Sequence, residues 1–275
     1  MSRYLVYDVF TDRPFGGNPL AIFPEADGIS ENALQSIARE FNFSETAFVL
    51  ADEDHDARIR IFTPTQEVPF AGHPLIGTAV ALADAGAGPG LSLALSGGIV
   101  AARAEGGRAS FLRDAPLDIL HDKVDPAIVA RCLGLPQASV AGAVMASVGL
   151  PFVLAETGSR ECLDAVLCDI DAFRRGHALY PSDFDFAILA YHREGSAIEA
   201  RMFAPLDDIP EDPATGSAAA ALGAFLRASE GRDLDLRISQ GVAMGRPSLI
   251  EVSARAEGVT IAGHAVRVME GRLLV

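Results

Sequence analysis

The apolar residues of the chain gather in many short runs that are bounded by glycine, proline and charged residues. Runs of this length that are rich in β-branched and aromatic side chains are typical of strands. In the first half, strands are expected at residues 3–10, 20–23, 42–50, 58–62, 91–95, 99–105 and 108–112. In the second half, they are expected at 141–147, 152–156, 185–191, 197–203, 234–239, 248–254, 258–262 and 264–271.

In other segments the apolar residues repeat with a period near 3.6, which predicts helices and not strands. Ser30 stands as a cap before apolar positions with helical spacing, which predicts a surface helix packed on a sheet. Asp125 and Pro126 begin a short helix that Gly134 ends, with Cys132 on its apolar face. Two more helices are expected near residues 159–166 and 169–174.

Two further helices are apolar and rich in alanine on every side. The first is predicted from Pro74 to about Ala85 and the second from Pro213 to about Arg227. A helix that is apolar all round has to be buried. Since strands surround both segments in the sequence, each half of the chain is expected to curl a sheet around one such helix.

The starts of these two helices share one pattern. His73, Pro74, Gly77, Thr78 and Ala79 correspond to Asp212, Pro213, Gly216, Ser217 and Ala218, each pair 139 residues apart. Other stretches repeat as well: residues 60–64 resemble 201–205, residues 47–50 resemble 187–190, and residues 17–22 resemble 149–154. Two homologous halves are therefore predicted.

We place the halves at residues 1–118 and 119–275, joined by a linker near residues 115–123, with the last strand able to return to the first half. A chain of 275 residues with 49% hydrophobic content supports two domains with a core each. The predicted fold class is α+β, with two pseudo-symmetric and mostly antiparallel β-barrels, each around a central helix.

A helix start leaves unpaired backbone N–H groups and carries a partial positive charge, so it favours an anion. Two such starts, each with a nearby glycine, suggest one small ligand held between them. The alternative is structural: Asp212 is then only a helix cap, with Pro213 in the first turn, and the glycines serve packing. His73 is as compatible with a structural role as with a functional one.

Composition narrows the possible partners. The net charge of −15 argues against nucleic acid and against an anionic membrane surface as partners. No apolar run reaches the roughly 20 residues of a membrane span, and no signal peptide is recognised, so a cytoplasmic protein is expected. The three cysteines (Cys132, Cys162 and Cys168) form no metal pattern, so no metal is expected.

Glu45 is the candidate acid or base. It lies among Phe43, Ala47 and Phe48, and an apolar setting favours the neutral carboxyl group. A glutamate held in this way can take a proton from one carbon atom and return it to another. The alternatives are a glutamate that faces water and one that is paired with an arginine such as Arg60.

Several longer motifs together resemble the phenazine-biosynthesis F-type (PhzF-like) family, whose fold is that of diaminopimelate epimerase. The resemblance covers nearly the whole chain. It rests on Tyr7-Asp8-Val9-Phe10-Thr11, Gly16-Gly17-Asn18-Pro19-Leu20-Ala21, Asn42-Phe43-Ser44-Glu45-Thr46-Ala47-Phe48, Gly72-His73-Pro74, Glu211-Asp212-Pro213-Ala214-Thr215-Gly216-Ser217, Gln240-Gly241 and Met244-Gly245-Arg246-Pro247-Ser248.

The resemblance implies a site in a cleft between two similar domains, a homodimer, and a cofactor-independent isomerase acting on a dihydro-hydroxyanthranilate-type acid. It gives Glu45 the acid/base role, in one half only. The substrate contacts that it implies are Gly72, His73, Asp212, Gly216 and Ser217, and Asn18 either reaches the site or shapes a turn.

One departure sets the chain apart from the thiol racemases of the same fold. Those enzymes carry a cysteine at each helix-start motif, where this chain has Ala71 and Ala214. The leading hypothesis is therefore a cofactor-free isomerase of a small anionic carboxylate substrate. The alternative is a non-catalytic protein that binds a small metabolite or a partner. Hydrolysis lacks a nucleophile motif such as Gly-x-Ser-x-Gly around Ser217.

Overall fold

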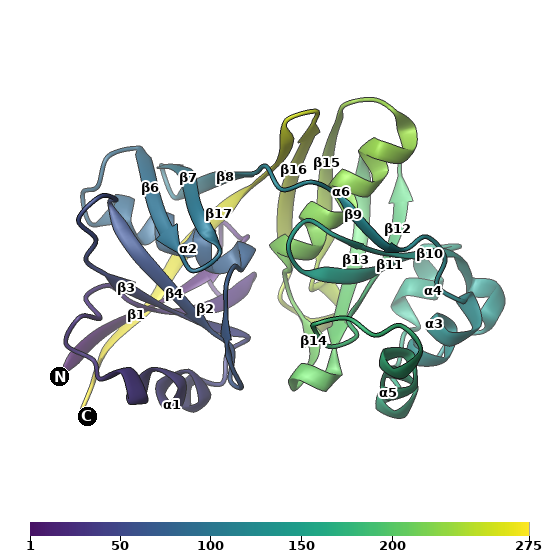
Figure 1. Cartoon of the computed structure of the whole chain (residues 1–275), viewed down its shortest axis with the longest axis horizontal. Coiled ribbons are helices and arrows are strands. Elements are labelled where there is room, and N and C mark those ends of the chain that lie inside the picture. The colour runs from purple at the N-terminus through teal and green to yellow at the C-terminus, as the bar shows by residue number, and fades with distance from the viewer. Residues whose placement is uncertain (275) are drawn as a thin grey trace. The chain divides into compact units, whose positions relative to one another are not determined.

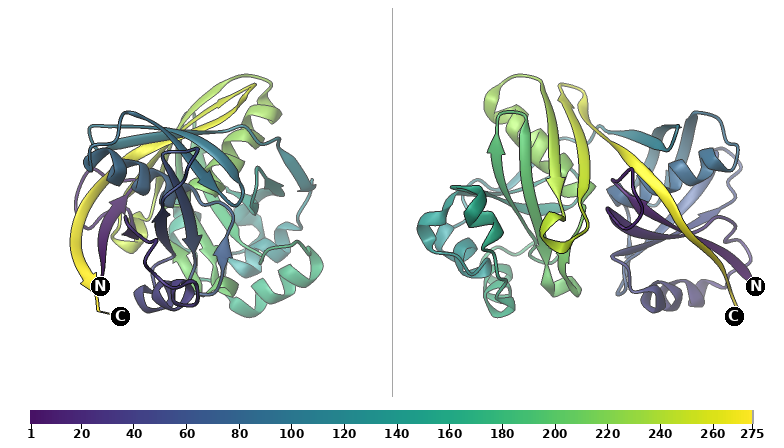
Figure 2. Two further views of the ribbon diagram at one scale, coloured as in Figure 1. Left: turned by 60° about the vertical axis from the view of Figure 1, so that its left-hand side comes forward. Right: turned by 180° about the vertical axis from the view of Figure 1, so that it is seen from behind.

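The computed structural model describes residues 1–274 and divides them into two compact units (Figure 1). The first unit comprises residues 1–112 together with residues from Ile261 onward, and the second comprises residues Arg113–Thr260. The C-terminal strand therefore returns to the first unit, where it lies beside the N-terminal strand (Figure 2).

The first unit is a β-barrel around one helix. Strands β1 and β2, β3 and β4, β6 and β7, and β7 and β8 pair in antiparallel fashion, while β2–β3 and β4–β6 are parallel. Strand β17 closes the barrel by pairing with both β1 and β8. The elements are β1 (Ser2–Val9), β2 (Asn18–Phe23), α1 (Glu31–Phe41), β3 (Glu45–Leu50), β4 (Ala57–Phe62), β5 (Glu67–Val68), α2 (Gly72–Asp84), β6 (Gly90–Leu95), β7 (Gly98–Glu105), β8 (Arg108–Arg113) and β17 (Gly258–Leu273).

The second unit repeats this plan. Its strands pair in the same sequence of antiparallel and parallel neighbours, from β10–β11 through the parallel β11–β12 and β13–β15 to β15–β16. The elements are β9 (Asp118–His121), α3 (Pro126–Cys132), β10 (Val140–Ser147), β11 (Pro151–Thr157), α4 (Arg160–Asp164), α5 (Ile170–Leu179), β12 (Ile188–Glu194), β13 (Ala197–Ala204), β14 (Ile209–Asp212), α6 (Gly216–Glu230), β15 (Leu234–Gln240) and β16 (Ser248–Arg255). Short 3₁₀ turns lie at Gln137–Ser139, Pro205–Asp207 and Val242–Met244. The predicted fold class, two pseudo-symmetric barrels around central helices, is confirmed.

The central helices fill their barrels because their side chains are small. In α2, all ten residues from Gly72 to Ala81 are buried, and α6 buries an almost continuous run of alanines. The close approach is visible at Gly77, where an added Cβ atom would lie 2.6 Å from the Leu20 side chain and 2.8 Å from that of Val9. Gly77 is therefore a packing residue between α2 and the barrel wall.

A matched pair of arginines marks the same point in both barrels. Arg60 lies over the ring of Phe62 and bonds Glu67, and Arg201 lies over Phe203 and bonds Glu211. The two cation–π distances are both 5.1 Å. Each arginine thus joins the strand before the central helix to the segment that leads into it.

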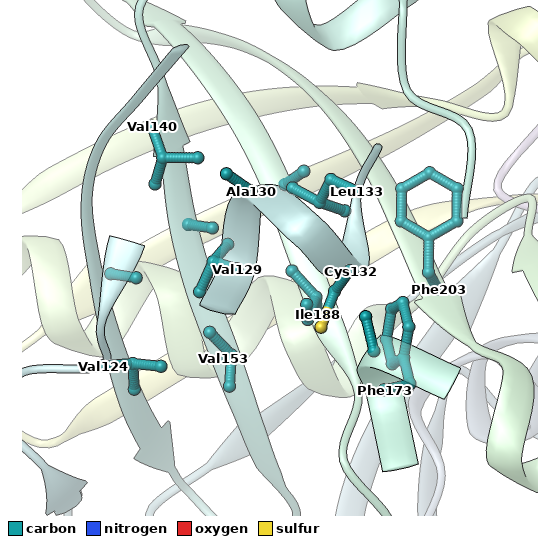
Figure 3. Close-up of a cluster of buried hydrophobic side chains, with 14 of the residues drawn as sticks. Val124, Val129, Ala130, Cys132, Leu133, Val140, Val153, Phe173, Ile188 and Phe203 are labelled. Atoms are coloured by element: carbon teal, nitrogen blue, oxygen red, sulfur yellow. The ribbon is translucent and has the colours of Figure 1, made fainter. Parts of the chain in front are cut away.

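Helices α3 and α5 cover the outside of the second unit and enclose an apolar cluster (Figure 3). Val129, Cys132, Phe173 and Phe186 are fully buried in it. Burial raises the pKa of the Cys132 thiol to about 12, so this thiol stays protonated. The expected core position of Cys132 is confirmed.

Several local predictions were wrong. The expected linker at residues 115–123 contains strand β9, which pairs with β10, and residues 258–273 form one continuous strand where a break was expected. Helix α6 begins at Gly216, and its cap is Thr215. The predicted cap, Asp212, instead ends strand β14.

Strand register also corrects the internal alignment of the repeat. Thr46 pairs with Phe62, and Ile188 pairs with Phe203, so Glu45 corresponds to Ala187. The alignment of residues 47–50 with 187–190 was therefore wrong by two positions. A shift of two keeps every side chain on its own face of the strand, which is why the hydrophobic pattern did not reveal it.

Replacing Gly77 with valine should destabilise the protein by about 2 kcal/mol, because the new side chain overlaps Leu20 and Val9 and a packed core resists added volume. Urea unfolding measures the change. Gly88→Val is the matched control, since nothing lies within 4 Å of a Cβ atom at that position. An equal effect at both positions would contradict the packing role of Gly77.

Candidate active site

Glu45 is the first residue of β3 and follows a sharp corner. Helix α1 ends at Phe41, and Asn42 takes a left-handed conformation with φ of 53°, its N–H bonding the carbonyl of Ala38. The chain then enters β3 beside β2, where Glu45 pairs with Leu20. The Glu45 side chain is 18% exposed, so it is neither sealed in the core nor on the open surface.

Arg60 is not the partner of Glu45. Its guanidinium group bonds both oxygens of Glu67, at 2.8 and 2.6 Å, and one oxygen of Glu31 at 2.5 Å. The Arg60 guanidinium group is therefore paired with Glu67 and Glu31, and the alternative in which it pairs with Glu45 is wrong.

His73 lies next to Glu45. It sits in the first turn of α2, is 3% exposed, and places Nδ1 3.4 Å from Oε2 of Glu45. The same Nδ1 lies 3.4 Å from the amide nitrogen of Asn18, the first residue of β2. The Ser44 hydroxyl in turn donates to Oδ1 of Asn18 at 3.1 Å. The first unit thus brings three expected residues together and adds Ser44.

The environment of His73 keeps its imidazole neutral. Burial lowers the pKa of His73 from 6.5 to about 3, because the apolar interior disfavours the charged ring. Within residues 1–274, its Nε2 is buried and has no hydrogen-bond partner. A buried polar atom without a partner is costly, so it marks a place where a ligand atom is expected.

Asp212 anchors the corresponding cluster of the second unit. It is 4% exposed, and its Oδ2 accepts a hydrogen bond from the Thr215 hydroxyl at 2.5 Å. Gln240 clamps the same turn, since its Nε2 donates to the Asp212 carbonyl at 2.7 Å and to the Thr215 hydroxyl at 3.0 Å. Its Oε1 accepts from the Thr215 N–H at 3.3 Å. Asp212 is therefore fixed by a buried network.

The two helix starts lack the side chains that usually neutralise them. Neither Ala71 before α2 nor Thr215 before α6 makes a side-chain cap bond, and neither first turn holds an acidic residue. Gly72 and Gly216 open the helices, and Ser217 follows half-buried. These N–H groups keep the positive helix end available to an anion.

Only one copy of the repeat carries the pair of Glu45 and Asn18. The position of Glu45 is held by Ala187 in the second unit, and by strand register that of Asn18 is held by Leu150. A methyl group transfers no proton. The site residues of the two copies have thus diverged on one scaffold.

Ser44, Thr215 and Gln240 stood in recognised motifs but were given no role. A hydroxyl directly before a candidate base is the one signal that pointed to Ser44. Nothing local linked Gln240 to Thr215, because 25 residues separate them. Within residues 1–274, the buried hydroxyl oxygen of Thr78 also has no hydrogen-bond partner.

Known proteins are similar to this chain in sequence and in fold. The phenazine biosynthesis-like protein family (PhzC-PhzF) matches residues 7–271. The trans-2,3-dihydro-3-hydroxyanthranilate isomerase of Pseudomonas aeruginosa is 36% identical, with 99% of each chain covered. The crystal structure of a PhzF-family protein of Bacillus anthracis superposes with a TM-score of 0.87 at 26% identity, covering 100% of this chain and 99% of that one. A hydroxyproline epimerase of Agrobacterium vitis shares the fold, with a TM-score of 0.64 at 14% identity over 98% of this chain and 91% of its own.

The similar relatives and the fold define an isomerase with the two-barrel architecture. The chain belongs to the phenazine biosynthesis-like (PhzC-PhzF) family. Within residues 1–274, no helix combines the length and the apolar character that crossing a membrane requires.

The neutral state of His73 predicts a pH dependence of stability. The folded protein binds no proton at His73 until the pH nears 3, whereas the unfolded chain binds one below about 6.5. Stability should therefore fall by about 1.4 kcal/mol per pH unit as the pH decreases through this window. Urea unfolding of wild type and His73→Gln at pH 7.5 and pH 5 checks the sign, since the variant lacks this contribution. Equal slopes would contradict it.

Proposed function

We propose that the chain is a cofactor-independent isomerase that moves a proton on a small carboxylate substrate, with Glu45 as acid and base. The observation that carries the proposal is the cluster of Glu45, His73 and Asn18. Its carboxylate is mostly buried, with a neutral imidazole at 3.4 Å that is itself held by an amide. A positioned carboxylate of this kind suits proton transfer at carbon.

The neutral state of His73 supports the use of Glu45 in both directions. An imidazolium at 3.4 Å would hold Glu45 in its ionised form, whereas a neutral ring supplies no counter-charge. Glu45 therefore takes the proton from the first carbon, becomes a neutral carboxylic acid, and returns the proton to the second carbon. The protein begins and ends the cycle in the same protonation state.

The substrate class follows from the groups that remain for binding. Helices α2 and α6 begin without acidic residues or side-chain caps, which suits a carboxylate better than a cation. The P. aeruginosa relative is named for trans-2,3-dihydro-3-hydroxyanthranilate, a small ring acid. We propose a substrate of this type for the present chain.

We assign substrate contacts to Gly72, His73, Asn18, Asp212, Gly216 and Ser217. The backbone N–H groups of Gly72 and Gly216 and the Ser217 hydroxyl serve as neutral donors to carboxylate oxygens. The Asp212 carboxylate is the acceptor for a substrate amine or hydroxyl. Its rigid hydrogen-bond network holds it in place before binding. We also propose a homodimer, which rests on the family resemblance alone, and a cytoplasmic location, which rests on the sequence analysis.

Glu45→Gln tests the catalytic assignment. The amide keeps the shape of the side chain but accepts no proton, so turnover of trans-2,3-dihydro-3-hydroxyanthranilate should fall by at least about 10³-fold, within the usual range for a removed acid/base. Proton NMR in D₂O follows both isomerisation and deuterium uptake. Calorimetric titration should show that the variant still binds the substrate.

Glu67→Gln is the matched control, because Glu67 lies in the same barrel and its carboxylate bonds Arg60, which is not a partner of Glu45. It should retain wild-type turnover. Turnover retained by Glu45→Gln would overturn the role of Glu45. Binding with neither turnover nor deuterium uptake in wild type would favour a non-catalytic binding protein.

A further inference from the structure

We infer that Asn18, held by Ser44, fixes His73 as the neutral tautomer with its proton on Nε2. Asn18 is thereby a positioning residue: it acts on the site through His73, whatever contact with substrate it makes itself. The inference deepens the proposed function, and only the effect of the tautomer on catalysis rests on that function. The tautomer itself is a property of the free protein.

The atom that needs explaining is Nδ1 of His73. Two groups approach it at the same distance of 3.4 Å, the amide nitrogen of Asn18 and Oε2 of Glu45. A neutral imidazole nitrogen either donates or accepts a hydrogen bond. Nδ1 can therefore accept from Asn18 or donate to Glu45, and the two arrangements correspond to the two tautomers.

Ser44 decides between them. Its hydroxyl donates to Oδ1 of Asn18 at 3.1 Å, so the amide oxygen is turned towards Ser44 and the amide N–H groups towards His73. The orientation of an amide is assigned from such a network. With an N–H directed at it, Nδ1 is the acceptor and the ring proton lies on Nε2.

The backbone leaves Asn18 little freedom to turn over. Asn18 is 1% exposed and begins β2, which is paired with β1 on one side and with β3 on the other. Gly17 before it has φ of 62°, and a Cβ atom there would lie 2.3 Å from the carbonyl oxygen of Val9. The chain therefore enters β2 along one path, which fixes the Asn18 backbone, while Ser44 and His73 contact the two ends of its amide group.

This tautomer gives each ring nitrogen a separate task. Nδ1 uses its single lone pair to accept the Asn18 N–H, so it donates nothing to the neighbouring Oε2 of Glu45 and does not hold that carboxyl group in its ionised form. The Nε2–H group, which has no acceptor within residues 1–274, is left to donate to a ligand oxygen on which negative charge develops. His73 keeps its own proton throughout.

Nitrogen NMR of the wild-type protein tests the tautomer directly. In ¹⁵N-labelled, ligand-free protein, long-range ¹H–¹⁵N correlation should show a protonated Nε2 and an unprotonated Nδ1 for His73, assigned by its loss in His73→Gln. The chain has six histidines, so the other five serve as internal references. A protonated Nδ1 would overturn the inference, whatever the substrate proves to be.

Asn18→Asp provides the second arm. The side chain keeps its shape, but it now presents a carboxylate oxygen to Nδ1, which should draw the ring proton to Nδ1 or charge the ring. We expect the His73 correlations to change and kcat/KM to fall about 10²-fold or more, the usual cost of one lost transition-state donor. Ser44→Ala should give a mixture of the two tautomers and a smaller loss.

Asn42→Asp is the matched control, because Asn42 is an exposed left-handed residue in the same unit. It adds the same charge and should leave both the spectrum and the activity unchanged. An unchanged His73 spectrum in folded Asn18→Asp would contradict the positioning role. If the tautomer is as inferred but Glu45→Gln retains turnover, the proposed function fails and the role of Asn18 in setting the tautomer stands.

Discussion

The close packing of an apolar helix against the inside of its barrel determines the rest of this structure. Leu20 on β2 rests on Gly77 of α2, at a distance that leaves no room for a Cβ atom. Asn18 lies two residues before Leu20 and so on the same face of the strand, while His73 lies one helical turn before Gly77. The contact that fixes the core therefore also brings Asn18 to His73. Through the parallel pairing of β2 with β3, the same packing positions Glu45.

The two copies of the repeat keep the features that stabilise the fold but differ in the residues around the helix starts. Both copies keep the buried helix, the strand order and the arginine stacked on phenylalanine. The residues around the helix starts have diverged, with Glu45 and Asn18 in one copy and Ala187 and Leu150 in the other. The second copy instead holds a carboxylate, Asp212, inside a network with Thr215 and Gln240. In the proposed function, one copy supplies the group that transfers the proton and the other supplies a fixed acceptor.

Features that depend on local pattern were predictable from the sequence. The two central helices, the repeat and the prominence of Glu45 and His73 all follow from periodicity, composition and motif. The start of α6 was not predictable, because Asp212 followed by Pro213 is a strong local signal for a helix start. The structure uses Asp212 differently, since Thr215 donates to its carboxylate and Gln240 holds the turn from 25 residues away. Strand β9 was missed for a related reason: its identity comes from pairing with β10. The contact of Asn18 with His73 spans 55 residues and has no local signature.

The proposed site has to attract an anionic substrate without help from the net charge of the chain. With a net charge of −15, the protein attracts no anion by its overall field. The neutral imidazole of His73 lies beside Glu45, and the hydroxyl of Thr215 donates to Asp212. Neutral donors stabilise developing negative charge without holding Glu45 in its ionised form, as a nearby lysine or arginine would. In the proposed reaction, Glu45 accepts a proton and then releases it to carbon. A buried neutral histidine in a fixed tautomer adds no charge that would oppose either step.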